Sequence, residues 1–229
     1  MSERTLTLDE KTVERFQRNI LNWFRTNGRS FPWRKTRNPY RVILAEMLLQ
    51  KTNVEKVLPV YKSLIKKYPN VHSLASANLR ALTSQILPLG LLYRAKRMKR
   101  IAQSVVRDHN GRFPKSAKEL RQLYGVGDYM TNAVRAFAFG ENVPIVDTNV
   151  IRIFDRVFGL KSERPRARTD KLIWEKIGVT VPVQSSREYN LALLDFAALV
   201  CIHYSPKCHI CPMQKFCNYY ISLSQSVQR

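Results

Sequence analysis

All four cysteines of this 229-residue chain lie in one short window near its end, CIHYSPKCHICPMQKFC. They are Cys201, Cys208, Cys211 and Cys217, which gives the spacing C-x6-C-x2-C-x5-C. Thiols grouped in this way could form two disulfides, bind zinc, or ligate an iron–sulfur cluster. The window by itself leaves the three possibilities open.

Two carboxylates occupy positions at which they could take part in chemistry. Asp147 lies between an apolar run and a helical pattern in VPIVDTNVIRIF. Taken alone, this position favours a helix N-cap, for which Asp is a preferred residue. Glu46 lies within the apolar stretch VILAEMLLQKT, where an ionised side chain would be costly to bury. Periodicity alone is equally consistent with a Glu46 side chain that faces solvent.

A glycine pair separates two helical patterns in LRQLYGVGDYMTNAVRAFAFG. Gly125 and Gly127 flank one apolar residue, Val126, so the chain can make a tight hairpin with backbone N–H groups directed outward beside a helix N-terminus. Such an arrangement binds phosphate without contacting a base. The motif is short, and an ordinary packing bend between two helices explains it equally well.

The charge of the chain indicates a polyanionic partner. There are 39 Lys and Arg residues against 17 Asp and Glu residues, which gives a net charge of +22. These charges are spread through segments that also carry periodic apolar residues, as in a folded domain with a basic face. Nucleic acid is therefore the leading partner, ahead of an anionic membrane surface or a charge that serves only solubility.

The N-terminal segment MSERTLTLDEKTVERF is charged and does not resemble a signal peptide. The longest apolar stretch, LALLDFAALVCI, is about half the length of a membrane span and contains Asp195. We therefore expect a cytoplasmic or nuclear protein that is not secreted. Disulfides rarely persist in those compartments, so the disulfide interpretation of the cysteines is disfavoured.

Apolar residues at three- and four-residue steps predict helices through most of the chain. The clearest example is residues 92–109, with an apolar stripe on one side and Lys and Arg on the other. Gly, Pro and Asn clusters separate the segments. The other predicted helices are 12–24, 40–52, 54–67, 116–123, 129–139, 149–158 and 190–200.

The hairpin, the helix after it, Asp147 and the cysteine spacing together resemble the helix-hairpin-helix DNA glycosylases of the endonuclease III and MutY superfamily. The resemblance extends from FPWRKTRNPYRVILAEMLLQKT through LLDFAALVC to Cys217, and the cysteine spacing is its most specific element. It implies an all-α fold with a six-helix domain at residues 38–142 that carries the hairpin. Residues 1–37 and 143–229 would form a [4Fe–4S] cluster domain.

The resemblance implies that the four cysteines ligate a [4Fe–4S] cluster. Structural zinc usually takes two close ligand pairs, and only Cys208 and Cys211 form one here, so the cluster is favoured over zinc. Hydrolysis of a glycosidic bond transfers no electrons. The expected role of the cluster is therefore to fix the loop that carries Lys207, which could then contact a DNA phosphate.

In the resembling family the residue at the position of Asp147 is catalytic, because a carboxylate near the sugar stabilises its positive charge in the transition state. Glu46 matches a catalytic Glu, which would act as an acid toward the leaving base. Members that also cleave the strand carry Lys at the position of Tyr129. Tyr129 has no amine, so a monofunctional enzyme without strong lyase activity is expected.

The target base must leave the helical stack before it can be excised. The resemblance implies that Gln50 and Lys51 fill the space it vacates, and that Leu91 enters the duplex from the other side. Adenine glycosylases usually carry paired tyrosines where this chain has Leu91 and Leu92, and usually a further C-terminal domain. Both differences favour an enzyme for thymine or uracil opposite guanine, with an adenine glycosylase as the alternative.

The function expected from the sequence is therefore that of a monomeric DNA N-glycosylase, a hydrolase of base excision repair that acts on duplex DNA. A rival of another class is a DNA-binding module that kept the fold and the cluster without activity. The presence of Glu46, Tyr129 and Asp147 together argues against that rival, because a module without catalysis has no reason to retain a costly buried carboxylate.

Overall fold

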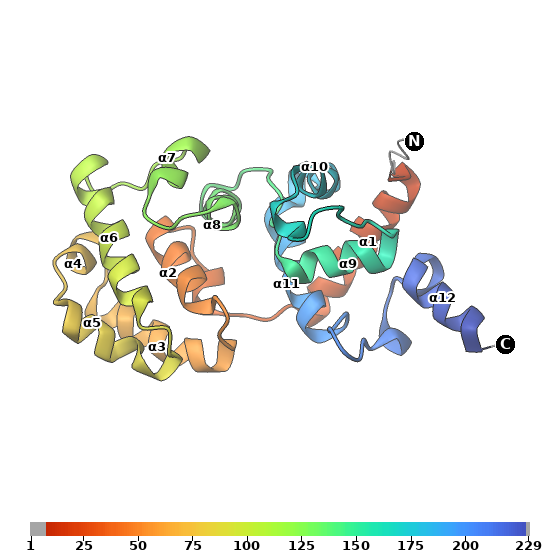
Figure 1. Ribbon diagram of the computed structural model, residues 1–229, viewed down its shortest axis with the longest axis horizontal. Coiled ribbons are helices and arrows are strands. Elements are labelled where there is room, and N and C mark those ends of the chain that lie inside the picture. Colours follow the sequence, from red (N-terminus) through yellow and green to blue (C-terminus); the bar gives the residue numbers. More distant parts are fainter. Residues whose placement is uncertain (1–7, 228–229) are drawn as a thin grey trace. The chain divides into compact units, whose positions relative to one another are not determined.

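The computed structural model describes residues 8–227, and within that range it contains helices and connecting segments but no strand (Figure 1). The expected all-α class is confirmed. The described residues divide into two compact units, one formed by residues 30–140 and the other by residues 8–29 and 141–227. In the range described, no helix is both long enough and apolar enough to cross a membrane.

The unit of residues 30–140 contains seven α-helices. The segment 38–142, expected as a six-helix domain, covers nearly the same residues. Seven α-helices are present where six were expected. The short helix α4 is one that periodicity does not predict, and a capping box between Asn70 and Ser73 stabilises it. The helices are α2 (Pro39–Leu49), α3 (Val54–Lys67), α4 (Val71–Ala75), α5 (Leu79–Ile86), α6 (Tyr93–Asp108), α7 (Ala117–Gln122) and α8 (Asp128–Val134).

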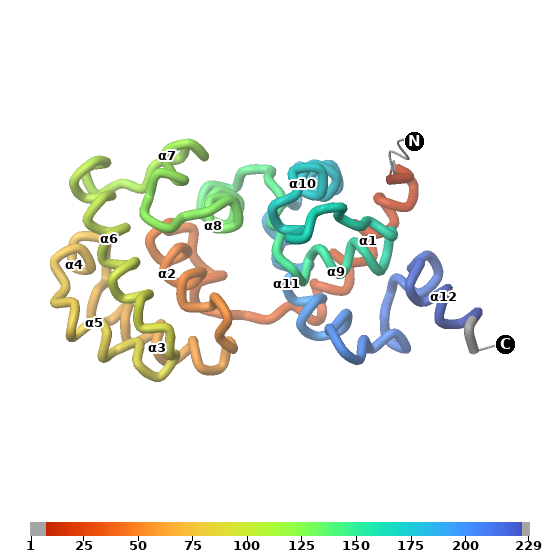
Figure 2. Tube along the Cα trace, in the orientation of Figure 1, coloured from red at the N-terminus to blue at the C-terminus, as the bar shows by residue number. Residues whose placement is uncertain are grey.

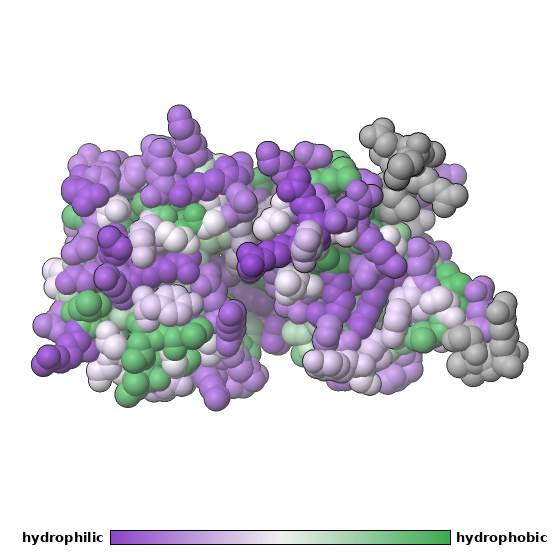
Figure 3. All heavy atoms as spheres, in the orientation of Figure 1, coloured by the Kyte–Doolittle hydropathy of each residue, from purple (hydrophilic) through white to green (hydrophobic). Residues whose placement is uncertain are grey.

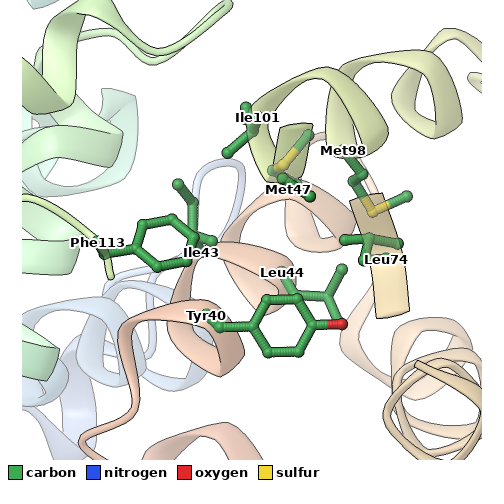
Figure 4. Close-up of a pocket in the computed structure, with 9 residues that line it drawn as sticks. Tyr40, Ile43, Leu44, Met47, Leu74, Met98, Ile101 and Phe113 are labelled. Carbon is green, nitrogen blue, oxygen red and sulfur yellow. The ribbon is translucent and has the colours of Figure 1, made fainter. Parts of the chain in front are cut away.

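Helix α2 lies at the centre of this unit and packs against α3, α6 and α8. Its side chains at Tyr40, Ile43, Leu44 and Met47 line a small apolar cavity together with residues of α4 and α6 (Figure 4). The hydroxyl group of Tyr40 donates to the carbonyl oxygen of Tyr68 at 2.6 Å. This packing fixes the rotation of α2, and therefore the direction in which its other side chains point.

The second unit is built on α1 (Glu10–Asn27), α9 (Thr148–Phe158), α10 (Lys171–Gly178), α11 (Ser186–Leu199) and α12 (Asn218–Val227). Its core is rich in aromatic rings: Phe16 lies 5.6 Å from Phe154 and 6.3 Å from Tyr189, measured between ring centroids. Asp195, fully buried in α11, accepts hydrogen bonds from the backbone N–H and the Nε of Arg29 at 2.8 and 2.7 Å. A buried carboxylate paired in this way is tolerated because its oxygens are satisfied.

Most helices predicted from periodicity are present, with shifted ends. The predicted helix 40–52 is too long, because α2 ends at Leu49 and the chain turns through Lys51, whose φ is 55°. Residues 71–75, 79–86, 171–178 and 218–227 are helical without having been predicted. In Figure 2 residues 141–147, which lead into α9, follow a curved path without regular secondary structure, and the N–H of Val143 donates to the carbonyl oxygen of Glu141 at 3.0 Å.

Candidate active site

Glu46 and Tyr129 form a hydrogen-bonded pair in the unit of residues 30–140. Glu46 lies on α2 and is 7% exposed, so the buried alternative holds and the solvent-facing one is wrong. The hydroxyl group of Tyr129, on α8, donates to Oε2 of Glu46 at 3.0 Å. A buried carboxyl group next to a phenol is a combination that can hold and move a proton.

The hairpin before α8 has the geometry that its glycines allow. Gly125 has φ of 72°, in the left-handed region that favours glycine, and Gly127 is the N-cap of α8. The Val126 side chain is buried, and its N–H donates to the carbonyl oxygen of Leu123 at 3.0 Å. The N–H of Val126 is therefore engaged inside the turn.

The two segments expected to enter the duplex have unusual backbone conformations. Only three non-glycine residues between 8 and 227 have positive φ, and Lys51 (55°) and Leu91 (48°) are two of them. Such conformations cost of order 1–3 kcal/mol each and cluster at functional sites. Lys51 is exposed in the loop after α2, and Leu91 is 38% exposed just before α6.

A buried arginine that sequence reasoning missed supports the loop after α2. Arg94 is fully buried and donates to the carbonyl oxygens of Leu48 (2.9 Å) and Gln50, and to Oγ1 of Thr52 (2.8 Å). Its guanidinium thereby satisfies carbonyls at the C-terminal end of α2. The signal in the sequence was an Arg next to the apolar stripe of residues 92–109, which cannot be distinguished there from a surface charge.

Asp147 belongs to the other unit and is the N-cap of α9. Its Oδ1 accepts from the backbone N–H groups of Asn149 (2.9 Å) and Val150 (2.7 Å), and its Oδ2 accepts from Nδ2 of Asn149 (2.9 Å). The N-cap interpretation is therefore confirmed. It does not compete with a catalytic role, since a carboxylate held by three donors at a helix N-terminus has a fixed position and a partly exposed environment.

Two further side chains, not expected from the sequence, position Asp147. The Oδ1 of buried Asn190 accepts from the backbone N–H of Ile145 at 3.0 Å, and its Nδ2 donates to the carbonyl oxygen of Val143 at 3.0 Å. These two bonds hold the segment before Asp147. Arg152 donates to Oδ1 of Asn149 at 2.8 Å and to the carbonyl oxygen of Cys201 at 3.0 Å. The start of α9 is thus fixed from both sides.

The four cysteines line one pocket of this unit, together with Arg156 and Lys207. Nη1 of Arg156 lies 3.5 Å from Sγ of Cys201, and the backbone N–H of Met213 lies 3.4 Å from Sγ of Cys211. Between residues 8 and 227, no three or more His, Cys, Asp or Glu side chains, these cysteines included, converge as ligands of a single metal ion. Lys207 is exposed at the edge of the pocket.

The chemistry of these thiols fits an iron–sulfur cluster. Burial raises the pKa of Cys211 to about 12, and it also raises the pKa of Cys208 and Cys217. Buried thiols of this kind become thiolates only when bound cations replace their protons. Cys201, Cys208, Cys211 and Cys217 line one pocket without converging on a single point, and they would supply the four thiolates that a [4Fe–4S] cluster takes.

The structure thus brings together Glu46 with Tyr129, and the cysteines with Lys207, whereas Asp147 belongs to a different unit from Glu46. Hydrophilic side chains cover most of the visible surface of each unit, and smaller apolar patches are scattered among these side chains (Figure 3). This agrees with the excess of Lys and Arg in the sequence.

Relatives of this chain are DNA glycosylases. The thymine/uracil-DNA glycosylase of Pyrobaculum aerophilum is 38% identical over 203 residues, covering 87% of this chain and 88% of that protein. The thymine-DNA glycosylase of Aeropyrum pernix is 36% identical over 94% of this chain and 98% of its own length. The adenine DNA glycosylase of Buchnera aphidicola (strain Bp) is 33% identical, but this chain covers only 59% of it.

The comparison of structures leads to the same group. The solved structure of a thermostable thymine-DNA glycosylase superposes with a TM-score of 0.88 at 35% identity, covering 93% of this chain and 98% of that one. A non-covalent complex of endonuclease III with DNA shares the fold, with a TM-score of 0.81 at 22% identity over 96% of this chain and 100% of that one. The sequence matches the HhH-GPD superfamily over residues 44–178. The chain therefore belongs to the HhH-GPD superfamily of base excision DNA repair proteins.

Proposed function

We propose that this protein is a monofunctional DNA glycosylase that removes thymine or uracil mispaired with guanine. The observation that carries the proposal is the buried Glu46–Tyr129 pair, placed in a chain whose relatives are named thymine/uracil-DNA glycosylases. A non-catalytic DNA-binding module would have no use for a carboxyl group that is 7% exposed and hydrogen-bonded to a phenol.

Hydrolysis replaces the bond between C1′ of the sugar and the base nitrogen with a bond to a water oxygen. The electron pair of the broken bond leaves with the base, and the sugar carries positive charge in the transition state. We assign Asp147 to stabilise that charge and to orient the attacking water. Glu46 is assigned to deliver a proton to the departing base. The attacking water loses one proton as its oxygen bonds to C1′, and transfer of that proton to the Glu46 carboxylate would restore the acid form.

The residue at position 129 determines the subclass that we propose. A lysine there could attack C1′ and form a Schiff base that leads to strand cleavage. The hydroxyl group of Tyr129 donates instead to Glu46, so its role is to orient the carboxyl group. The proposed product is therefore an intact strand with an abasic site.

Displacement of the target base is assigned to Gln50, Lys51 and Leu91. The positive φ of Lys51 and Leu91 supports this assignment, because strained loop residues are retained where function needs them. The amides of Gly125 and Gly127 would hold a DNA phosphate next to the N-terminal end of α8. Lys207 is assigned to a second phosphate contact from the cysteine loop.

We infer that Cys201, Cys208, Cys211 and Cys217 ligate a [4Fe–4S] cluster that keeps the Lys207 loop in place. We expect protein purified without oxygen to be brown, to absorb near 400 nm and to contain about four irons per chain. Metal analysis and the visible spectrum provide the measurement. Colourless, folded protein with one zinc per chain would contradict the assignment.

The alternative substrate is adenine opposite guanine or 8-oxoguanine, supported by the adenine DNA glycosylase of Buchnera aphidicola (strain Bp), which is 33% identical. Purified protein can be incubated with duplexes that contain G·T, G·U, A·U or 8-oxoguanine·A, followed by alkali to cleave abasic sites. We expect cleavage of G·T and G·U after alkali, little of A·U, and none of 8-oxoguanine·A. Strand cleavage before alkali, or trapping of the parent protein on DNA by borohydride, would contradict the monofunctional assignment.

A further inference from the structure

One side chain of α6 joins two of the candidate DNA contacts. Nη1 of Arg97 donates to Oε1 of Gln50 at 3.0 Å, and Nη2 of the same guanidinium donates to the carbonyl oxygen of Gly125. Gln50 belongs to the loop after α2, and Gly125 belongs to the hairpin. A planar guanidinium can hold two acceptors at a fixed separation and orientation, which a lysine cannot do.

We propose that Arg97 is a positioning residue that sets the side chain of Gln50 relative to the hairpin. The inference rests on the proposed function, in which Gln50 fills the space of the displaced base while the hairpin holds the backbone. Gln50 and the hairpin are hydrogen-bonded to the same guanidinium. The distance between the Gln50 side chain and the hairpin amides is therefore fixed before DNA binds. Preorganisation of this kind lowers the cost of reaching the flipped state.

The fit between Arg97 and the hairpin is close. A Cβ atom added to Gly125 would lie 2.6 Å from Nε of Arg97 and 3.2 Å from its Cδ. A side chain at position 125 would therefore displace the end of Arg97, and the φ of 72° favours glycine there independently. Arg100, about one turn further along α6, lies over the ring of Tyr124 at 4.1 Å, so α6 contacts two successive hairpin residues.

The stability of the fold does not explain Arg97. The guanidinium is half-buried, which lowers its pKa, and its Nε–H is buried without an acceptor in the part of the chain that the structure describes. Burying a charged group with an unpaired donor is unfavourable. Arg94 also has a buried Nε–H without an acceptor in that part of the chain, but it is fully buried and its other donors hold the carbonyl oxygens of Leu48 and Gln50. Arg97 is less buried and donates to one side-chain oxygen and one backbone carbonyl, so it can be replaced with less damage to folding.

The test compares Arg97→Met with Lys96→Met, which removes one positive charge from an exposed position of the same helix. Under single-turnover conditions with G·U duplex, we expect Arg97→Met to lower the excision rate constant about tenfold or more. The affinity for matched duplex should fall to about the same extent in both variants, because each loses one charge. Arg97→Lys should restore only part of the rate, since an ammonium group cannot span both acceptors.

A double-mutant cycle distinguishes positioning from a general weakening of the fold. If Arg97 acts through Gln50, Gln50→Ala and the double variant Gln50→Ala/Arg97→Met should excise at rates within about twofold of each other. The rise in fluorescence of 2-aminopurine beside the mismatch should be reduced equally in these variants. The inference would be overturned if the rate loss in the double variant equalled the product of the two single losses. It would also be overturned if Arg97→Met excised at the parent rate. Failure of the proposed function would be seen differently, as a parent protein that releases no base.

Discussion

Replacing Asp147 by Asn is expected to lower the single-turnover rate of base excision by at least about a hundredfold, which corresponds to about 3 kcal/mol in the activation free energy. The expectation follows from the charge of the transition state. A carboxylate stabilises the cationic sugar, whereas a neutral amide does not. Affinity for DNA should be kept, because it depends on Lys, Arg and the hairpin amides, and loss of a negative charge near the backbone does not weaken it.

The substitution separates chemistry from folding because Asn is also a favoured N-cap residue. Its side-chain oxygen can still accept from the backbone N–H groups of Asn149 and Val150, so α9 should keep its start and thermal unfolding should change little. Asp9→Asn is a matched control, since Asp9 is the N-cap of α1 and accepts from the N–H of Thr12 at 2.9 Å. If Asp147→Asn excised as fast as Asp9→Asn, Asp147 would be a helix cap only.

Replacing Glu46 by Gln is expected to lower the excision rate by about 10²- to 10⁴-fold, the range typical of a lost general acid or base. Gln has nearly the same shape, and its Oε1 can still accept the hydroxyl group of Tyr129. It has no acidic proton to give to the leaving base. The measurement is single-turnover excision from G·U duplex, with circular dichroism to verify folding.

Tyr129→Phe is the companion variant for Glu46. It removes the 3.0 Å hydrogen bond and leaves the carboxyl group in place, so its effect on rate should be smaller than that of Glu46→Gln. Combining the two changes should cost less than the product of the single effects, because the residues act as a pair. Equal rates for parent, Glu46→Gln and Tyr129→Phe would mean that the pair only stabilises the packing between α2 and α8.

Long periodic helices and local motifs could be predicted from the sequence. Residues 54–67 are helical as expected, since a single apolar stripe determines the structure of that segment. The stretch around Glu46 was different, because α2 is apolar on nearly all sides and its periodicity does not show which side chain faces the core. The 7% exposure of Glu46 and the hydrogen bond from Tyr129, a residue distant in sequence, identify Glu46 as a buried and partnered carboxyl group.

Contacts made by buried arginines and short helices could not be predicted. Helix α4 has only five residues and depends on the capping box between Asn70 and Ser73, which leaves no periodic signal. In the sequence, Arg94 and Arg97 cannot be distinguished from the other Lys and Arg residues of residues 92–109, which are expected at the surface. Their acceptors come from other segments, and such long-range pairings are fixed only when the helices pack.

The most direct test of the account is the mass balance of one reaction on a G·U duplex with purified protein in excess. Free uracil and the integrity of the strand are measured together, by mass spectrometry and by gel electrophoresis before and after alkali. One free uracil is expected for each duplex consumed, and the strand should stay intact until alkali is added. Stoichiometric DNA binding without release of uracil or thymine, by protein that carries its cluster, would contradict it.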